Sequence, residues 1–358
     1  MNIDKRILKS EEEVVFKLRD MYIKHGYSCF KMAKFEEYDL YSQNRDFLVS
    51  DSVITFNDTN GKLMALKPDV TLSIVKNFRE EGGVKRVYYN ENVYRVSDKT
   101  HCYKEIMQSG IEALGEVTEY NLFEVVCLAA ESLACISSDC VLNISHLGIL
   151  SELICGMESE TKAEILNCIG EKNAHGVREV CEKNGVCDET TELLAFLANG
   201  SGDYENAIGR LRELTENEKI LASLDSLETI IEQVKKVSKV CVRADFSTVS
   251  DMNYYNGLVF RGFIKGIPSG VLSGGQYDKL MSKLGKCGGA VGFAVYLDLF
   301  ERMKEPLRYD VDVLLLYKPD DDMKKVHEAV SAFIADGKSV SAQTSVPAKL
   351  TYRELVRL

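Results

Sequence analysis

Residues 86–115 have the sequence RVYYNENVYRVSDKTHCYKEIMQSGIEALG, and the rest of the chain is organised around this stretch. Val87, Tyr89, Val93 and Ile106 are apolar or aromatic, and charged or amide side chains fall between them. This alternation with a period of two residues is typical of half-buried strands. A polar segment separates the two halves, so the stretch predicts two strands joined by a loop.

Three polar residues lie inside these strand patterns, namely Arg95, Gln108 and Glu112. Gln108 and Glu112 are separated by an even number of positions, which places both side chains on one face of a strand. That face is either the solvated side of an antiparallel sheet or the floor of a pocket. Such a pocket would suit a ligand with both a carboxylate and an ammonium group. Periodicity alone leaves both interpretations open.

The bulk properties predict a globular protein of two domains. The chain has 358 residues and a net charge of -11, which argues against a broad, non-specific nucleic-acid surface. Eleven cysteines occur without a CxxC pair or zinc-site spacing, so we expect reduced thiols in a cytoplasmic protein and no bound metal. The charged N-terminus does not suit a signal peptide, and no apolar run approaches the length of a membrane span.

The N-terminal patterns predict a helix at 10–26, an extended segment at 27–35 and a hairpin formed by 53–56 and 63–66. Pro68 and Asp69 favour the start of another helix. Plain capping of that helix is a sufficient structural explanation for Asp69 and Thr71.

After residue 115, the sequence predicts a helix at 117–137 and a buried strand at 141–144. The segment from about 156 to 237 is helical and charged, which indicates a helical insertion. We then expect strands at 240–246, 254–264 and 270–272, a tight turn at 273–275, a short helix near 280–284 and an apolar helix at 290–303. The end of the chain predicts a βαβ unit, with strands at 310–317 and 339–344 and a helix at 321–335.

None of the common catalytic motifs occurs in the sequence, which has no GxxxxGK[ST], GxGxxG, HExxH or GxSxG. The glycine-rich segment 285–292 lacks the spacing of a phosphate-binding loop, and close packing of a helix on a strand explains it better. The five histidines are scattered without ligand spacing. We therefore assign no catalytic residue and no cofactor.

Six segments in a fixed order resemble histidyl-tRNA synthetase: LKPDVT (66–71), YYNENVYR (88–95), KEIMQSGIEALG (104–115), MNYYNGLVF (252–260), SGGQYDKL (273–280) and AVGFAVYLDLF (290–300). The likeness spans residues 1–305, and the ordered set is highly specific. Within that superfamily the chain most resembles the ATP phosphoribosyltransferase regulatory subunits, a family that keeps the synthetase core and has lost aminoacylation. LKPDVT is similar to the LRPDxT form of that family, whereas the synthetase form is LRPEGT.

The resemblance implies an α+β fold with a class II aminoacyl-tRNA synthetase core, in which helices flank a six-stranded antiparallel sheet and the first motif forms a dimer. It also implies a histidine pocket on the sheet. The residues carried over by position are Asp69, Thr71, Arg95, Gln108, Glu112, Tyr254 and Tyr255. By this resemblance, Asp69 and Thr71 match positions around the histidine ammonium, and Arg95 matches the motif-2 arginine. Gln108 and Glu112 match the polar residues that reach the amino acid. Tyr254 and Tyr255 match the tyrosines on the imidazole side.

The sequence departs from the synthetase pattern at positions where the synthetase binds ATP. Cys102, Ser250 and Leu299 stand where the synthetase has arginines. Because a triphosphate is held and activated by guanidinium or metal clamps, their loss leaves no evident way to use ATP. Ala33 replaces the motif-1 proline, which makes the dimer geometry less certain. Residues 306–358 resemble a truncated remnant of the anticodon-binding α/β domain.

The resemblance therefore implies a non-catalytic regulatory subunit that binds a short-form ATP phosphoribosyltransferase, as a homodimer within a hetero-oligomer. It implies histidine as ligand, feedback control of the first step of histidine biosynthesis, and no tRNA. Two alternatives stay open: an active histidine–tRNA ligase with an unusual site, and a stand-alone histidine-binding sensor.

Overall fold

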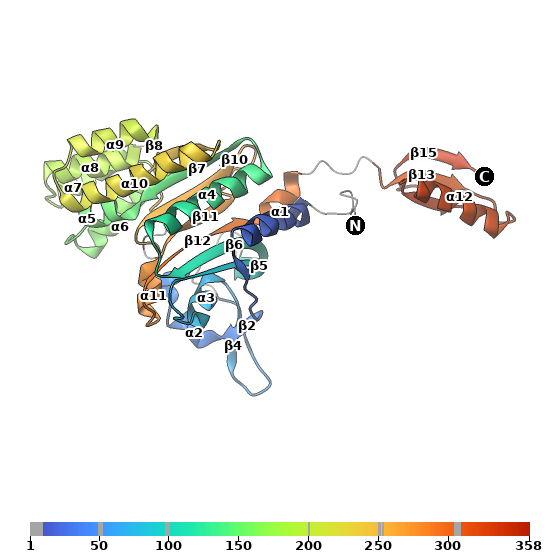
Figure 1. The fold of residues 1–358 in the computed structure, drawn as a ribbon, viewed down its shortest axis with the longest axis horizontal. Coiled ribbons are helices and arrows are strands. Elements are labelled where there is room, and N and C mark those ends of the chain that lie inside the picture. The colour runs from blue at the N-terminus through green and yellow to red at the C-terminus, as the bar shows by residue number, and fades with distance from the viewer. Residues whose placement is uncertain are drawn as a thin grey trace. The chain divides into compact units, whose positions relative to one another are not determined.

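The computed structural model describes residues 10–48, 53–96, 101–199, 201–249, 252, 254–303 and 309–358. The chain divides into two compact units, Met1–Glu301 and Arg302–Leu358, and each is considered by itself (Figure 1). Ser250 lies outside the described residues. Within the described ranges, every helix is too short or too polar to cross a lipid bilayer.

The first unit contains a large sheet, several flanking helices and a smaller sheet. The strands of the large sheet are β1 (Ser28–Cys29), β5 (Val84–Val96), β6 (Tyr103–Gly115), β7 (Cys140–His146), β8 (Ser201–Gly202), β9 (Cys241–Asp245), β10 (Leu258–Ile264), β11 (Leu272–Gln276) and β12 (Gly289–Tyr296). The helices are α1 (Ser10–Lys24), α2 (Tyr38–Ser42), α3 (Thr71–Asn77), α4 (Glu119–Ile136), α5 (Leu147–Leu153), α6 (Ser159–Gly170), α7 (Ala174–Lys183), α8 (Asp188–Asn199), α9 (Tyr204–Glu213), α10 (Glu218–Val237) and α11 (Asp278–Lys283).

In the described residues, the large sheet has the strand order β1-β5-β6-β12-β11-β10-β7-β9-β8. The run of six strands from β5 to β7 is antiparallel at every pairing. Strand β1 adds in parallel to β5, and β9 adds in parallel to β7. The predicted antiparallel core is therefore confirmed, with parallel strands added beside it.

The hairpin predicted from residues 86–115 is confirmed as β5 and β6. These strands pair along their whole length, from Val84 opposite Gly115 to Val96 opposite Tyr103. Tyr88 packs into the core on one face of the sheet, whereas Tyr89 packs into the core on the other. Both faces of the hairpin are thus covered along its inner part, whereas the alternation predicted strands that are only half-buried.

Helices cover both faces of the sheet (Figure 1). On one face lie α1 and α4, where Leu18 and Leu128 share a core with Phe293 of β12. On the other face lie α3 and α11, where Leu72 and Leu280 share a second core with the hairpin. The sheet is therefore the middle of three layers. The site described below lies on the face that carries α3 and α11.

Between β7 and β9 the chain forms helices α5 to α10, drawn in green and yellow in Figure 1. Apolar side chains on one side of each helix are buried, among them Leu194, Leu224 and Ile231. The predicted helical character of residues 156–237 agrees with this segment, and its only described strand is the two-residue β8.

The smaller sheet of the first unit has the order β2-β4-β3, with β2 (Phe35–Glu37), β3 (Thr55–Asn57) and β4 (Leu63–Leu66). The predicted hairpin is confirmed, because β3 and β4 pair antiparallel around a turn that ends near Gly61. The extended segment predicted at 27–35 is mostly irregular, since only its ends belong to strands.

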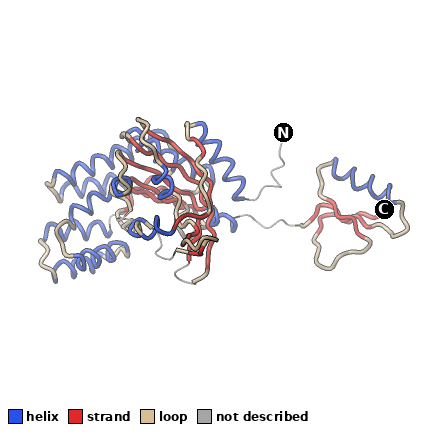
Figure 2. Tube along the Cα trace, turned by 90° about the horizontal axis from the view of Figure 1, so that it is seen from below, coloured by secondary structure: helices blue, strands red, loops and turns tan. Residues whose placement is uncertain are grey.

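The second unit has the predicted βαβ order. It consists of β13 (Val311–Leu316), α12 (Met323–Ala335), β14 (Val340–Gln343) and β15 (Tyr352–Arg357), and β13 pairs in parallel with both other strands. Figure 2 shows the strands of this unit in red and its helix in blue. Val313, Leu314 and Leu315 form its buried centre. The sequence did not predict β15. The identity of this unit as an anticodon-binding remnant stays a prediction.

Two predictions near the end of the first unit are wrong. Residues 290–303 form strand β12 and then a 3-10 helix, Leu297–Met303, instead of one apolar helix. The segment is apolar because β12 lies between β6 and β11 and is buried on both faces. Likewise, Ser273–Gly275 lies within β11 and is not a turn. Gly274 is required there because a Cβ atom would overlap Phe293 and the Gly292 carbonyl.

Candidate functional site

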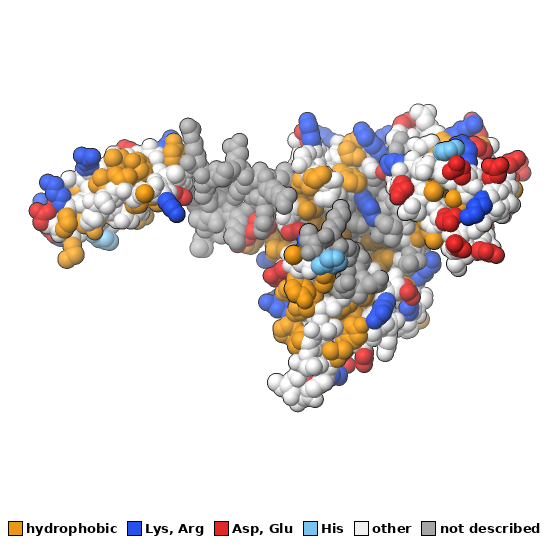
Figure 3. Space-filling model, turned by 180° about the vertical axis from the view of Figure 1, so that it is seen from behind, with side chains coloured by type: hydrophobic (Ala, Val, Ile, Leu, Met, Phe, Trp, Pro, Cys, Tyr) orange, Lys and Arg blue, Asp and Glu red, His pale blue; other side chains and the backbone are white. Residues whose placement is uncertain are grey.

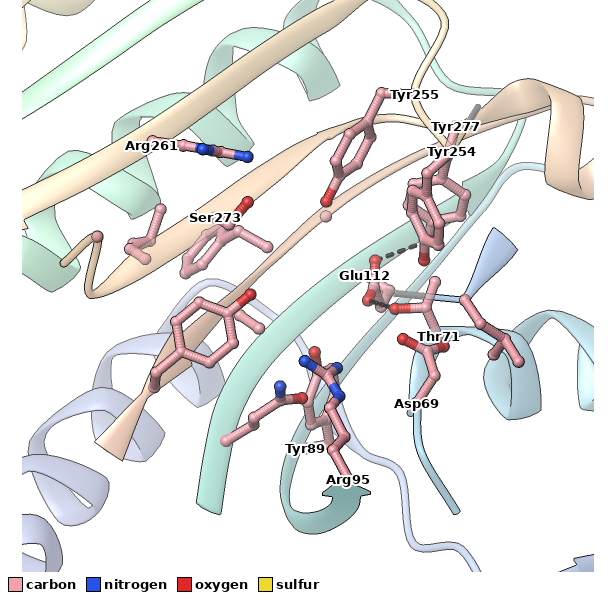
Figure 4. Close-up of a pocket in the computed structure, with 18 of the residues that line it drawn as sticks. Asp69, Thr71, Tyr89, Arg95, Glu112, Tyr254, Tyr255, Arg261, Ser273 and Tyr277 are labelled. Atoms are coloured by element: carbon pink, nitrogen blue, oxygen red, sulfur yellow. Dashed lines mark hydrogen bonds between the residues drawn. The ribbon is translucent and has the colours of Figure 1, made fainter. Parts of the chain in front are cut away.

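A cavity of about 470 Å³ opens on the sheet face that carries α3 and α11 (Figure 4). Its volume lies within the range of about 300–1,000 Å³ that is typical of small-molecule sites. The structure brings all seven predicted residues to its lining: Asp69, Thr71, Arg95, Gln108, Glu112, Tyr254 and Tyr255. These residues come from four separate segments of the chain, and the sequence predicted that they meet only through the resemblance.

Gln108 and Glu112 form part of the cavity floor on strand β6. Their exposed fractions are 4% and 2%, so the interpretation of this face as a solvated surface is wrong. Two hydroxyl groups hold the Glu112 carboxylate: Thr71 Oγ1 donates to Oε1 at 2.7 Å, and Tyr277 Oη donates to Oε2 at 2.6 Å. The carboxylate is thus fixed in orientation by neutral donors, and neither of them supplies a positive charge.

Asp69 lies beside Glu112 at the start of α3 and is also buried. Its Oδ1 accepts a hydrogen bond from the backbone N–H of Leu72 at 2.7 Å, so the capping interpretation is confirmed for this residue. Capping does not explain Thr71, because its hydroxyl donates to Glu112. Asp69 therefore combines a structural contact with a place in the cavity wall.

Burial changes the protonation of these carboxyl groups. The pKa of Glu112 is raised to about 8: burial is the main cause, the hydrogen bonds from Tyr277 and Thr71 oppose the rise, and the nearby charge of Asp69 adds to it. Burial also raises the pKa of Asp69, against the opposing effects of the Leu72 N–H and of Arg95. A cationic group in the cavity would favour the ionised form of both carboxyls, so the pair is suited to an ammonium ligand.

We expect the raised pKa of Glu112 to appear in the stability of the unliganded chain. The folded chain keeps this carboxyl protonated at pH values where the unfolded chain, with a pKa near 4.5, has released the proton. The contribution to stability is therefore complete below about pH 4.5 and is lost as the pH rises through about 8, with a slope of at most ~1.4 kcal/mol per pH unit.

Urea unfolding between pH 5 and pH 9 tests this expectation on the parent chain and on Glu112→Gln, which cannot titrate. The free energy of unfolding of the parent should fall relative to that of the variant as the pH rises. A difference between the two chains that is constant with pH would contradict the assignment.

Aromatic side chains form another wall of the cavity. The ring of Tyr254 lies 4.7 Å from that of Tyr255 and 5.7 Å from that of Tyr277, measured between centroids. Burial raises the pKa values of Tyr254 and Tyr277 well above the ordinary value, so both hydroxyls stay protonated. Tyr254 and Tyr255 precede β10 rather than lying on it, so they are not the ordinary strand aromatics that the sequence allowed.

Arg95 lies near the end of β5, where its Nε donates to the Pro68 carbonyl at 3.0 Å. This bond ties the guanidinium to the segment that carries Asp69. In Figure 4 the guanidinium group points into the cavity below Glu112. Arg95 can therefore present its remaining N–H groups to an anionic part of a ligand.

Several lining residues were not predicted, namely Tyr89, Arg261, Ser273, Tyr277 and Tyr296. Tyr277 lies inside one of the segments that carry the resemblance, but nothing local links it to Glu112, which is 165 positions away. Arg261 could have been predicted as a site residue, because it is the one charged residue of the apolar strand LVFRGFI.

The glycine-rich segment 285–292 has a different use from the predicted packing of a helix on a strand. Gly292 lies opposite Glu112 in the pairing of β12 with β6, and a Cβ atom there would overlap the Glu112 carboxylate. Gly288 has φ +89°, and a Cβ atom there would overlap the Gly115 carbonyl. These glycines therefore allow two strands and one buried carboxylate to come close together.

Two of the positions where the synthetase pattern has arginine are described. Cys102 is exposed and directly precedes β6, and Leu299 packs against the core of the first unit. Neither belongs to the lining of the cavity. Among the described residues, no group of three His, Cys, Asp or Glu side chains is placed to hold a metal ion.

Sequence comparison relates the chain to named proteins. A sequence model of the family described as histidyl-tRNA synthetase matches residues 3–299. The ATP phosphoribosyltransferase regulatory subunit of Clostridium acetobutylicum is 26% identical over an alignment that covers 94% of this chain and 89% of that protein. The protein of the same name from Caldanaerobacter subterraneus is 28% identical and covers 92% and 88%.

Structural comparison gives the same fold. The ATP phosphoribosyltransferase regulatory subunit/histidyl-tRNA synthetase of Bacillus halodurans matches with a TM-score of 0.79 at 23% identity, covering 97% of this chain and 93% of that one. Histidyl-tRNA synthetase from Nostoc gives 0.72 at 17% identity, covering 95% and 83%. A chain of the ATP phosphoribosyltransferase complex of Thermotoga maritima gives 0.63 at 18% identity, covering 79% and 96%.

Proposed function

Because this chain belongs to the histidyl-tRNA synthetase family, we propose that it is a non-catalytic member of that family, the regulatory subunit of an ATP phosphoribosyltransferase. The curated relatives described above carry this name and are matched over most of their length. In this role the chain associates with a short-form catalytic subunit, is required for the first step of histidine biosynthesis, and responds to histidine as feedback inhibitor.

One observation carries the proposal: the side chains that the resemblance assigns to an amino-acid ligand line one cavity, while the synthetase arginines are missing from the sequence. All seven residues carried over for histidine line the cavity. The positions of the missing arginines hold Cys102, Ser250 and Leu299. A pocket that keeps these seven residues but lacks the three arginines with which the synthetase pattern holds and activates ATP suits a sensor better than a ligase.

Histidine is the proposed ligand of the cavity. Its ammonium lies against Asp69 and Glu112 with Gln108 beside it, and its ring reaches the hydroxyl groups of Tyr254 and Tyr255. Arg95 faces its carboxylate. Each buried carboxyl then meets a positive charge, which the hydroxyl partners of Glu112 do not provide.

Charge supports a protein partner rather than tRNA. Residues 156–237 contain 17 Asp and Glu against 9 Lys and Arg, so this segment alone accounts for -8 of the net charge of -11. Figure 3 shows acidic side chains spread among basic ones on the visible face of this unit. Binding to a nucleic-acid backbone requires the opposite balance. The assembly that we propose is cytoplasmic and contains this chain as a homodimer.

Co-expression with a short-form ATP phosphoribosyltransferase from the same genome tests the proposed function. The two chains should co-elute as one complex, and the complex should turn over substrate at least tenfold faster than the catalytic subunit alone and be inhibited by histidine. Full activity and full histidine sensitivity of the catalytic subunit by itself would refute the proposal.

Histidine-dependent exchange between pyrophosphate and ATP tests the alternative function. We expect the purified chain to give the background rate, because the arginine positions hold neutral side chains. A clear exchange rate, abolished by Glu112→Ala, would show that the chain activates histidine and would favour the ligase over the regulatory subunit.

A further inference from the structure

The end of the cavity opposite Asp69 and Glu112 carries a positive charge that the proposed histidine pose does not use. Arg261 of β10 and Ser273 of β11 line this end. They are directly opposite each other in the strand pairing, and Ser273 is in turn opposite Ala294 of β12. Residues opposite each other in antiparallel strands share a face, so all three project from the sheet on the cavity side.

The two ends are well separated. In the sheet, β10 is three strands away from β6, which carries Glu112. At ~4.8 Å per strand, the backbones of Arg261 and Glu112 are roughly 14 Å apart across the strands. Figure 4 shows Arg261 and Ser273 on one side of the cavity and Asp69, Thr71 and Glu112 on the other. An amino acid anchored at Glu112 therefore leaves room at the Arg261 end.

The chemistry at this end suits an oxyanion with more than two acceptor oxygens. A guanidinium group can donate two parallel hydrogen bonds to a phosphate, and the Ser273 hydroxyl beside it can donate a third. Tyr296 of β12 adds a hydroxyl to the same lining, which also contains Gly270, without a side chain, and Ala294, with a small one. A carboxylate would use only part of this set of donors.

We propose that Arg261 and Ser273 form a second subsite, which binds a phosphate group, free or as a monoester, while histidine occupies the Glu112 end. The inference uses the proposed function only for the position of histidine. It makes the cavity a site for two ligands, one recognised by carboxylates and one by a guanidinium.

Calorimetry in a buffer without phosphate or sulfate tests the subsite, with inorganic phosphate and methyl phosphate as probes. We expect millimolar binding of inorganic phosphate to the full chain, with or without saturating histidine. Equal binding of methyl phosphate would assign the subsite to monoesters, and its failure to bind would assign the subsite to free phosphate. Arg261→Gln should weaken phosphate binding at least tenfold and leave histidine binding within about twofold.

Arg210→Gln is the matched control, because it removes the same charge from an exposed position on α9, outside the lining of the cavity, and should leave phosphate binding unchanged. Arg261→Lys, which keeps the charge but loses the two-pronged geometry, should bind phosphate with intermediate affinity. If Arg261→Gln does not fold, Ser273→Ala replaces it and should weaken phosphate binding a few-fold.

The subsite is refuted if the parent chain gives no heat at tens of millimolar phosphate, if Arg261→Gln binds phosphate normally, or if phosphate displaces histidine. These outcomes leave the proposed regulatory function standing. Conversely, if the chain fails to bind or activate the transferase but still binds phosphate in a way that depends on Arg261, the proposed function is refuted and the subsite is not.

Discussion

Histidine should bind the Glu112→Ala variant about tenfold to a hundredfold more weakly than the parent chain. In the proposed pose the carboxylate of Glu112 contacts the ligand ammonium in a buried site. Charge-assisted contacts of this kind contribute roughly 1.5–3 kcal/mol each, which corresponds to that range of affinity. The substitution also leaves the hydroxyls of Thr71 and Tyr277 without their acceptor. Calorimetry with histidine measures the effect directly.

Two controls isolate the charge of Glu112. Glu116→Ala removes a carboxylate four positions further along, where the side chain is exposed, and should leave the affinity unchanged. Glu112→Gln keeps the shape and should lose nearly as much affinity as Glu112→Ala. No heat from the parent chain at millimolar histidine, with the transferase present as well as absent, would refute histidine binding in this cavity. Unchanged affinity in Glu112→Ala would place the ligand elsewhere.

The second large effect is expected from Gly292→Ala, the smallest possible change in the cavity floor. A Cβ atom at this position overlaps the Glu112 carboxylate and crowds the Ile111 carbonyl. Overpacking of a core commonly costs about 1–3 kcal/mol, and here the backbone on one side cannot yield. We expect urea unfolding to show a loss of this size, together with at least a tenfold loss of histidine affinity.

Gly209→Ala is the matched control for this substitution. Gly209 lies on the exposed side of α9, and nothing is within 4 Å of its added Cβ atom. The same change should therefore stabilise the chain by about 0.5–1 kcal/mol, the opposite sign. A Gly292→Ala variant with unchanged stability and unchanged affinity would mean that Glu112 moves aside freely and does not contact the ligand.

The hairpin of β5 and β6 could be predicted from the sequence because the patterns that determine it lie within its own residues. Alternation and an even spacing were enough to place Gln108 and Glu112 on one face. Residues 290–303 show the limit of such reasoning, since an apolar run that is buried on both faces fits a helix as well as a strand. Only the pairing of β12 with β6 and β11 decides between them, and that pairing is not a local property.

The candidate site shows the same division. The resemblance correctly predicted seven residues that line one cavity. Lining residues from other segments were not predicted where no local sequence pattern indicated them. Tyr277 meets Glu112 only because β11 and β12 carry it there. For Asp69, the structural and functional explanations both hold, since one carboxylate oxygen caps α3 while the residue lines the cavity. Sequence reasoning could present these as alternatives but could not combine them.

The position of β12 has a consequence for how the chain emerges from a ribosome. This strand lies in the middle of the large sheet, between β6 and β11, yet it is the last of the sheet's described strands to be synthesised. Strand β6 ends at Gly115 and β12 at Tyr296, which is 181 residues later. At 5–20 residues per second, the edge of β6 waits roughly 10–35 s for its partner. During that time the edge of β6 is unpaired and can pair with a wrong strand. We therefore expect the yield of folded chain to depend on how well chaperones protect the nascent chain.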